Sequence, residues 1–164
     1  MKPNLHSYAE QMNYQNLIKA IDVIAKLRDP NEGCPWDLKQ THKSLLKYLI
    51  EESYEYIQAV EENNHTKMQE ELGDVLLQVL LHSQIASEGN HFNIDSVASV
   101  LANKMIHRHP HVFGNDDTKL SADEVITNWK KLKAKEKKKQ FHMWFIKTSR
   151  WKYSLFISTC GKTW

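Results

Sequence analysis

Two pairs of carboxylates, each spaced for one helical face, are the clearest sign of chemistry in this 164-residue sequence. Glu52 and Glu55 form one pair, directly after Glu51, and Glu71 and Asp74 form the other. Residues three apart lie on adjoining turns of a helix, so each pair would point to one side. The fifteen residues between Glu55 and Glu71 allow a short turn between two helices. We therefore expect an antiparallel helix pair in which the carboxylates face each other.

Four converging carboxylates repel one another unless a cation lies between them. Asp74 also precedes the most apolar stretch of the chain, where an unpaired charge is costly. Hard oxygen donors without a converging Cys or His favour Mg²⁺, with Mn²⁺ as a second choice. Mg²⁺ usually completes its shell with water and phosphate oxygens, so the pattern favours a phosphate-bearing ligand. Acidic pairs are also common on solvated helix faces, which is the alternative for either pair alone.

Two further groups of side chains could take part in chemistry. Lys104 and Arg108 are four residues apart, and beside a carboxylate–metal site they could hold phosphates, although such pairs are also common on surfaces. His107, His109 and His111 offer a transition-metal site as a weaker alternative. Their alternate spacing across a helix end does not give a preformed tetrahedral set.

Helical periodicity dominates the chain and supplies the elements that must position these groups. We expect helices near residues 14–28, 41–63, 66–89 and 95–109, and a fifth from residue 121. Capping boxes at residues 66–69 and 121–124 would open the third and fifth helices, and Gly89 would end the third. Residues 34–37 are expected to form a loop, and no strand is expected within residues 1–140.

The third helix is apolar around nearly its whole circumference after Asp74. A helix that is apolar all round must be buried all round, and five helices can hardly enclose one of their number. We therefore expect a subunit interface there, and a homodimer or higher homo-oligomer. The alternative is that Leu77 and Leu81 lie under the first helix or the tail. His82 on this helix is expected to be an interior histidine with its hydrogen bonds satisfied.

Composition excludes several classes of protein. The chain is 41% apolar and 26% charged, and no apolar run approaches the 18 residues of a membrane span. Cys34 and Cys160 lie 126 positions apart, which is neither a disulfide framework nor a zinc quartet. With no apolar leader at the start of the sequence, we expect a cytoplasmic protein in which both thiols are free.

The character of the sequence changes after residue 140. We expect one domain over residues 1–140 and an atypical tail over 141–164, which has seven aromatic residues, four basic residues and no acid. The lysine-rich stretch 130–139 and the tail could bind single-stranded nucleic acid. The remaining 18 Lys and Arg against 20 Asp and Glu make residues 1–140 mildly acidic, so nucleic acid is an unlikely partner.

Six blocks of the sequence resemble the signature of the MazG-type nucleoside triphosphate pyrophosphohydrolases. They occur in order within residues 14–139, with the gaps expected of that family. The blocks are GCPWD (33–37), QTH (40–42), EESYE (51–55), ELGD (71–74), RHPHVFG (108–114) and NWKKLK (128–133).

The resemblance implies an all-α fold with a four-helix-type bundle core, an extra C-terminal helix and an irregular tail, assembled as a homodimer. It also implies Mg²⁺-dependent hydrolysis of a nucleoside triphosphate to the monophosphate and pyrophosphate, in nucleotide-pool housecleaning or regulation. Water would attack the α-phosphorus, and charge stabilisation rather than a covalent intermediate would provide the catalysis.

The resemblance also assigns roles by position. Metal ligands would be Glu52, Glu55, Glu71 and Asp74, and the catalytic carboxylates would be Glu51, Glu52 and Glu55. Glu51 would support the ligands or help to orient water. Lys104 and Arg108 would hold the phosphates, and Trp129 would lie by the base or sugar. Lys67 would be a weaker candidate for a phosphate contact.

Two departures from the family keep a second function open. Members of the family often carry two copies of the domain, of which one can keep the motif with little activity, and this chain has one copy. The tail after residue 140 also leaves the family pattern. The alternative function is therefore a catalytically weak helical module that binds nucleotide or a partner protein.

Overall fold

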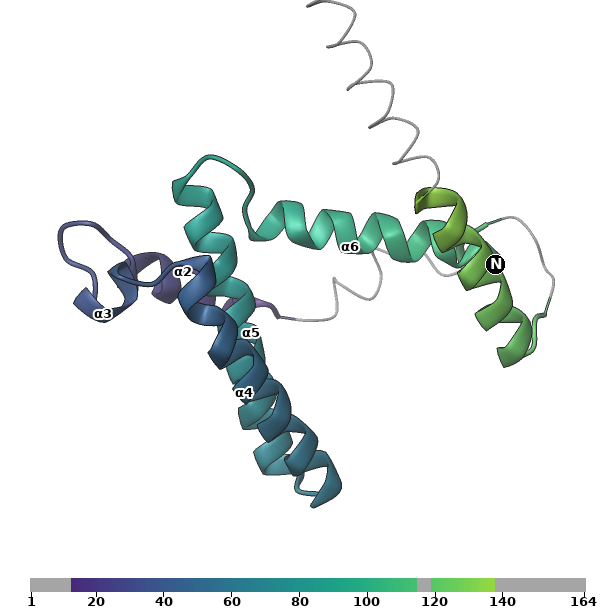
Figure 1. Ribbon diagram of the computed structural model, residues 1–164, viewed down its shortest axis with the longest axis horizontal. Coiled ribbons are helices and arrows are strands. Elements are labelled where there is room, and N and C mark those ends of the chain that lie inside the picture. The colour runs from purple at the N-terminus through teal and green to yellow at the C-terminus, as the bar shows by residue number, and fades with distance from the viewer. Residues whose placement is uncertain (1–12, 115–118, 138–164) are drawn as a thin grey trace, which may run out of the picture. The chain divides into compact units, whose positions relative to one another are not determined.

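The computed structural model describes residues 13–114 and 119–137. Within these residues every regular element is a helix, which confirms the all-α fold class (Figure 1). The helices are α2 (Gln15–Leu27), α3 (Pro35–Leu38), α4 (His42–Glu61), α5 (His65–Glu88), α6 (Ile94–Arg108) and α7 (Pro110–Phe113), followed by a helix over residues 122–137. The contacts divide the chain into two compact units, one up to Leu101 and one from Ala102, so that α6 contributes to both. The expected tail and Cys160 lie outside the described residues.

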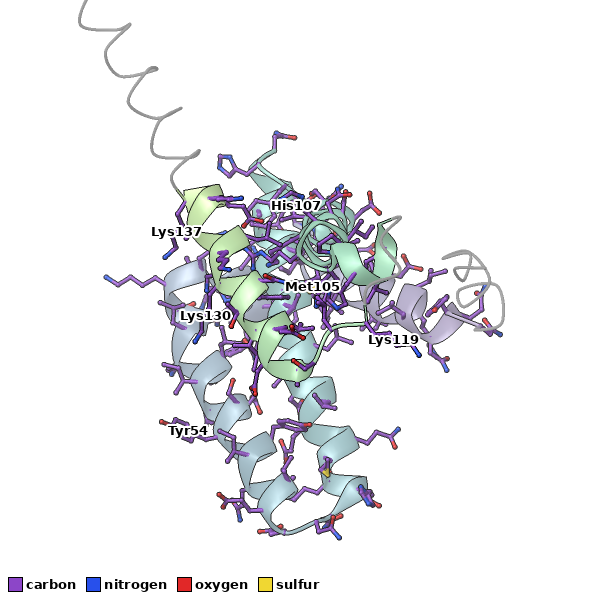
Figure 2. The ribbon with its side chains drawn as sticks, turned by 90° about the vertical axis from the view of Figure 1, so that its right-hand side faces the viewer. Tyr54, Met105, His107, Lys119, Lys130 and Lys137 are labelled. Atoms are coloured by element: carbon purple, nitrogen blue, oxygen red, sulfur yellow. The ribbon has the colours of Figure 1, made fainter. Side chains whose placement is uncertain are left out.

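Helices α4 and α5 form an antiparallel hairpin, and both views show them side by side (Figures 1 and 2). The turn between them is only three residues long because Asn63 adopts a left-handed backbone, with φ of 51°. The Asn64 N–H then donates to the Ala59 carbonyl at 3.1 Å, which closes the end of α4. The tightness of this turn fixes which residues of the two helices lie opposite each other.

The start of α5 differs from the expectation. Asn64, rather than Thr66, is the N-cap, and its side chain accepts the Lys67 N–H at 3.1 Å. The helix therefore begins at His65, and the capping box predicted at residues 66–69 is wrong. The reason is that the left-handed Asn63 leaves Asn64 extended, which is the backbone conformation an N-cap needs.

The end of α5 also corrects a prediction. Gly89 has φ of −85°, and Asn90 takes the left-handed position with φ of 55°. The N–H groups of Asn90 and His91 donate to the carbonyls of Ser87 and Ala86, each at 3.0 Å. Asparagine tolerates this conformation better than most residues, so the glycine is not needed there.

Residues 34–37 are not the expected loop, because Pro35–Leu38 form the one-turn helix α3. Pro35 is its first residue, where a fixed φ and a missing N–H cost nothing. The other expected boundaries hold within a few residues: Thr41 and Ser44 cap α4 reciprocally, Pro110 follows the end of α6, and Ser121 and Glu124 form the predicted capping box.

The core of the first unit lies where α2 and α4 meet α5. Ile24, Leu45, Leu80 and Leu81 are buried there, and Leu77 packs against them. As expected, a single chain does not bury the whole apolar stretch of α5 after Asp74, since Leu76 and Val79 are 38% and 37% exposed. The subunit interface expected there stays a prediction. Part of the apolar circumference therefore serves the core, and the rest is left on the surface.

A buried arginine ties the ends of α2, α3 and α5 together. The Arg28 guanidinium donates to both Glu88 carboxylate oxygens, through Nε at 2.7 Å and Nη2 at 2.6 Å. Its Nη1 donates to the Asp37 carbonyl and, at 3.4 Å, to that of Gln40. The Arg28 side chain is only 6% exposed, and these partners offset the cost of desolvating its charge.

None of the described helices is long and apolar enough to cross a membrane.

Replacing Arg28 should therefore destabilise the first unit. We expect Arg28→Met to lower the free energy of unfolding by about 2–3 kcal/mol, because Glu88 and two carbonyls lose their donor. Urea denaturation followed by circular dichroism measures this loss. Lys26→Met is the matched control on the same helix: Lys26 pairs with Glu32 on the surface, and the change should stay within about 0.5 kcal/mol. Equal effects of the two substitutions would contradict the buried clamp.

Candidate functional site

The α4–α5 hairpin brings together three of the four predicted metal ligands. Oxygen atoms of Glu52, Glu55 and Glu71 all lie within 4.8 Å of one another. Glu71 is buried, with 6% exposed, Glu52 is half-buried and Glu55 is exposed, so the cluster opens to solvent on one side. Asp74, one turn after Glu71 on α5, is half-buried and is close enough to act on both Glu52 and Glu71.

Electrostatics in this cluster are unfavourable for four free carboxylates. Burial, followed by the charges of Asp74, Glu55, Glu51 and Glu71, raises the pKa of Glu52. Burial also raises the pKa of Glu71, followed by the charges of Glu55 and Asp74 and by a hydrogen bond with the Glu55 carboxyl. A hydrogen bond between two carboxyls requires a proton, so the hairpin holds these groups closer than their charges favour.

A divalent cation fits this set of donors. Carboxylate oxygens are the ligands that Mg²⁺ and Mn²⁺ prefer, and a cation would offset both the burial of the charged carboxylates and the repulsion among them, the two causes of the raised pKa values. Among the described residues, this is the one place where three potential ligands from His, Cys, Asp and Glu converge. Glu51 is exposed beside the cluster and contributes charge to it.

Lys67, the weaker phosphate candidate, lies near the turn of the same hairpin. Its Nζ is 3.5 Å from Oε2 of Glu62, and its side chain is 31% exposed. Tyr54, by contrast, is 68% exposed and projects from α4 away from α5 (Figure 2). The acidic side chains therefore share the inner face of the hairpin, with an exposed aromatic residue on another face.

The second unit holds the predicted phosphate and base contacts. The Arg108 guanidinium lies 5.1 Å from the centre of the Trp129 ring and forms an ion pair with Glu136 at 2.6 Å. Lys104, one turn before Arg108 on α6, is exposed, and its charge acts on Glu136. The structure thus brings Arg108 and Trp129 together, while their roles toward a substrate stay predictions.

The three histidines that could have formed a metal site have other contacts. The His109 ring lies edge-on to Trp129, with ring centres 5.0 Å apart, and its Nδ1 is 2.6 Å from the Met105 carbonyl. His107 approaches Glu136 at 3.8 Å, and His111 meets His109 only through its ring. Within the described residues they do not form a three-ligand group, so the transition-metal alternative gains no support.

Sequence reasoning missed two residues that the structure singles out. Glu136 lies in the lysine-rich stretch, which looks like a solvated helix end, but it is seven residues after Trp129 and therefore on the same face. His42 lies in the QTH block and has no predicted role, although its Nδ1 lies 2.8 Å from Nδ1 of His82. The expectation for His82 is only half correct, because its Nε2 is buried without a hydrogen-bond partner among the described atoms, and burial lowers its pKa.

Comparisons with known proteins agree with this arrangement. Residues 40–113, from the residues before α4 to the end of α7, match the family model of the MazG nucleotide pyrophosphohydrolase domain. The crystal structure of a mazG-related protein from Thermotoga maritima superposes with a TM-score of 0.59 and 30% identity, covering 71% of this chain and 98% of that one. The chain belongs to the MazG family.

The curated relatives that this chain matches here are longer than the chain. A Thermotoga maritima protein named nucleoside triphosphate pyrophosphohydrolase/pyrophosphatase MazG is 52% identical over 120 residues, which is 73% of this chain and 45% of that protein. The uncharacterized protein YabN of Bacillus subtilis is 48% identical over 129 residues, 78% of this chain and 26% of that protein. The chain therefore spans less than half the length of these two relatives.

The carboxylate cluster should make stability depend on pH and metal. A carboxyl whose pKa is raised binds its proton more readily in the folded chain, so the folded state is stabilised as pH falls and loses that stability as pH rises. In EDTA at about pH 7, we expect Glu71→Gln to raise the melting temperature by about 2–4 °C. Lowering the pH to about 5, or adding Mg²⁺, should stabilise the wild type more than this variant.

Scanning calorimetry or thermal circular dichroism measures these shifts. Asp22→Asn, an exposed acid on α2, is the control and should respond to neither Mg²⁺ nor EDTA. A lower melting temperature for Glu71→Gln in EDTA, with an unchanged response to Mg²⁺, would contradict repulsion within the cluster.

Proposed function

We propose that this chain hydrolyses a nucleoside triphosphate to the nucleoside monophosphate and pyrophosphate. The observation that carries the proposal is the convergence of Glu52, Glu55 and Glu71 within 4.8 Å on a rigid hairpin of a MazG-family chain. Curated relatives that carry the name nucleoside triphosphate pyrophosphohydrolase support the same reaction, including one 44% identical over 126 residues. The reaction would remove triphosphates from the nucleotide pool.

In this proposal the carboxylates hold a divalent cation, Mg²⁺ or alternatively Mn²⁺. Glu52, Glu55, Glu71 and Asp74 would be its ligands, and a bound cation would supply charge neutralisation for the phosphates. Glu51, which is exposed beside the cluster, would support the ligands or orient the attacking water. Burial of Glu71 beneath the other carboxylates fixes the inner side of the site, while exposed Glu55 leaves the outer side open to the substrate.

Binding of the substrate would rest on the cations and on one aromatic ring. Arg108 would bind phosphate as a planar fork and Lys104 as a point charge, while Trp129 would lie beside the base or sugar. These roles follow from the MazG resemblance and from the contact between Arg108 and Trp129. Lys67 would contribute a phosphate contact only after it exchanges Glu62 for the substrate.

Removing a single ligand should abolish turnover without unfolding the chain. We expect Glu55→Gln and Asp74→Asn each to lower the rate of pyrophosphate release by about 100-fold or more, because the charge that holds the cation is lost. The assay follows pyrophosphate from each of the four nucleoside triphosphates, with Mg²⁺ or Mn²⁺. Circular dichroism checks the fold of both variants.

Glu61→Gln, at the exposed end of α4, is the matched control and should keep wild-type turnover. The proposal fails if the wild type releases no pyrophosphate from any nucleotide with either metal. Calorimetry that shows nucleotide binding without hydrolysis would favour the binding module instead.

We also propose that the chain assembles as a homodimer through the exposed apolar side of α2 and α5. A groove of about 410 Å³ lies between these helices, and its lining includes Val23, Gly73 and Leu76. Val23 and Leu76 are 47% and 38% exposed in the single chain, and a Cβ added at Gly73 would meet nothing within 4 Å. An apolar groove of this kind is more stable when a second copy covers it.

A charge placed in this groove should prevent assembly. We expect Leu76→Glu to convert the dimer to monomer, because a carboxylate would have to be buried between the two copies. Light scattering coupled to size-exclusion chromatography measures the mass. Ile126→Glu, on the helix at residues 122–137, is the control, since Ile126 is 51% exposed and lies outside the groove. A wild type that is monomeric at all concentrations would refute this assembly.

A further inference from the structure

The second unit contains an arginine that is held on one edge by a carboxylate. Arg108 donates from Nε to the Glu136 oxygens at 3.3 and 3.2 Å, and from Nη2 to Oε2 at 2.6 Å. The two side chains are 12% and 28% exposed, so this ion pair is better shielded from solvent than a surface pair. Pairing of this two-pronged kind fixes the plane of the guanidinium as well as its position.

An aromatic ring restrains a second side of the same arginine. The centre of the Arg108 guanidinium lies 5.1 Å from the centre of the Trp129 ring, within the range of a cation–π contact. Trp129 is in turn met edge-on by His109, whose own ring is anchored at the Met105 carbonyl. Trp129 and Glu136 are two turns apart on one helix, so a single helical face supplies both restraints on Arg108.

The pairing uses only part of what the guanidinium can donate. Glu136 engages the Nε and Nη2 atoms, which form one edge of the planar group. The two N–H groups of Nη1 lie outside this edge, and a phosphate oxygen can accept from Nη1 while the carboxylate keeps Nε and Nη2. The ion pair is therefore compatible with anion binding and also sets its direction.

Charges around the pair keep it ionised. The hydrogen bond from Arg108 lowers the pKa of Glu136, and the charges of His107 and Lys104 lower it further. The bond to Glu136 also raises the pKa of Arg108. Glu136 thus lies among the basic side chains of Lys104, His107 and Arg108. It accepts hydrogen bonds from Arg108, whose planar guanidinium must be oriented to make a flat contact with a phosphate.

We propose that Glu136 is a positioning residue that holds the Arg108 guanidinium against Trp129 with its Nη1 edge presented to a phosphate of the substrate. The inference rests on the proposed function, because it assigns Arg108 to the triphosphate. A different arrangement, in which Glu136 occupies the place of the phosphate on Arg108 and must be displaced, makes the opposite prediction for binding.

The test measures the binding of inorganic tripolyphosphate to the full chain by isothermal titration calorimetry. Removing a negative charge beside an anion site would by itself tighten binding. We nevertheless expect Glu136→Gln to raise the Kd about tenfold, because Arg108 loses its fixed orientation. Arg108→Gln should raise the Kd by a similar or larger factor, and the double variant should bind no more weakly than Arg108→Gln alone.

Conservative and control variants separate positioning from general damage. Glu136→Asp keeps the charge on a shorter stem and should recover part of the affinity lost in Glu136→Gln. Asp123→Asn removes an exposed acid from the same helix and should leave the Kd unchanged. Circular dichroism should show every variant folded at the temperature of the titration, although Arg108→Gln and Glu136→Gln each leave one partner of the ion pair without its counter-charge.

Three results would overturn the inference. Tighter binding by Glu136→Gln would show that the carboxylate competes with phosphate. If Glu136→Gln has the same Kd as the wild type, and the wild type hydrolyses nucleotide, Glu136 is not part of the site and the proposed function stays intact. Additive losses in the double variant would show that Glu136 acts independently of Arg108. Failure of the wild type to release pyrophosphate, in contrast, would defeat the proposed function itself.

Discussion

Repulsion among carboxylates is the constraint around which the first unit is organised. Glu52, Glu55 and Glu71 lie closer together than their charges favour, and burial, followed by the neighbouring carboxylates, raises the pKa values of Glu52 and Glu71. The helices can hold them there because Leu45, Leu80 and Leu81 stabilise the hairpin through the apolar core in which α2 and α4 meet α5. Stability obtained from the core thus maintains a site that is unfavourable until a cation binds.

The precision of that site depends on how the hairpin is closed. Asn63 and Asn64 end one helix and begin the next within three residues, which leaves no freedom for one helix to slide along the other. At the opposite end of α5, Arg28 joins Glu88 to the carbonyls around α3, so both ends of this helix are fixed by polar contacts. A metal site needs this rigidity because ligand distances must be held within a few tenths of an ångström.

The second unit uses a different balance of charge. Arg108 carries the positive charge that the proposed reaction needs for its phosphates, and Glu136 restrains that charge without neutralising the whole cluster, since Lys104 and His107 lie nearby. The apolar side of α2 and α5, with Val23 and Leu76 exposed, adds a surface that a second copy can cover.

Periodicity and short motifs in the sequence were sufficient for the all-α class, most helix bounds, the two carboxylate pairs and the family. These features are local: a spacing of three residues places Glu52 with Glu55 in any helix, and Pro110 disfavours a regular helix through the residues before it, so that α6 ends at Arg108. Only the tertiary structure decided which groups meet across elements, such as Glu71 with Glu55, Arg108 with Glu136 and His42 with His82. It also decided that Asn64 caps α5 and that Leu72 and Leu76 remain exposed, because capping depends on the preceding turn and burial depends on which neighbours are present.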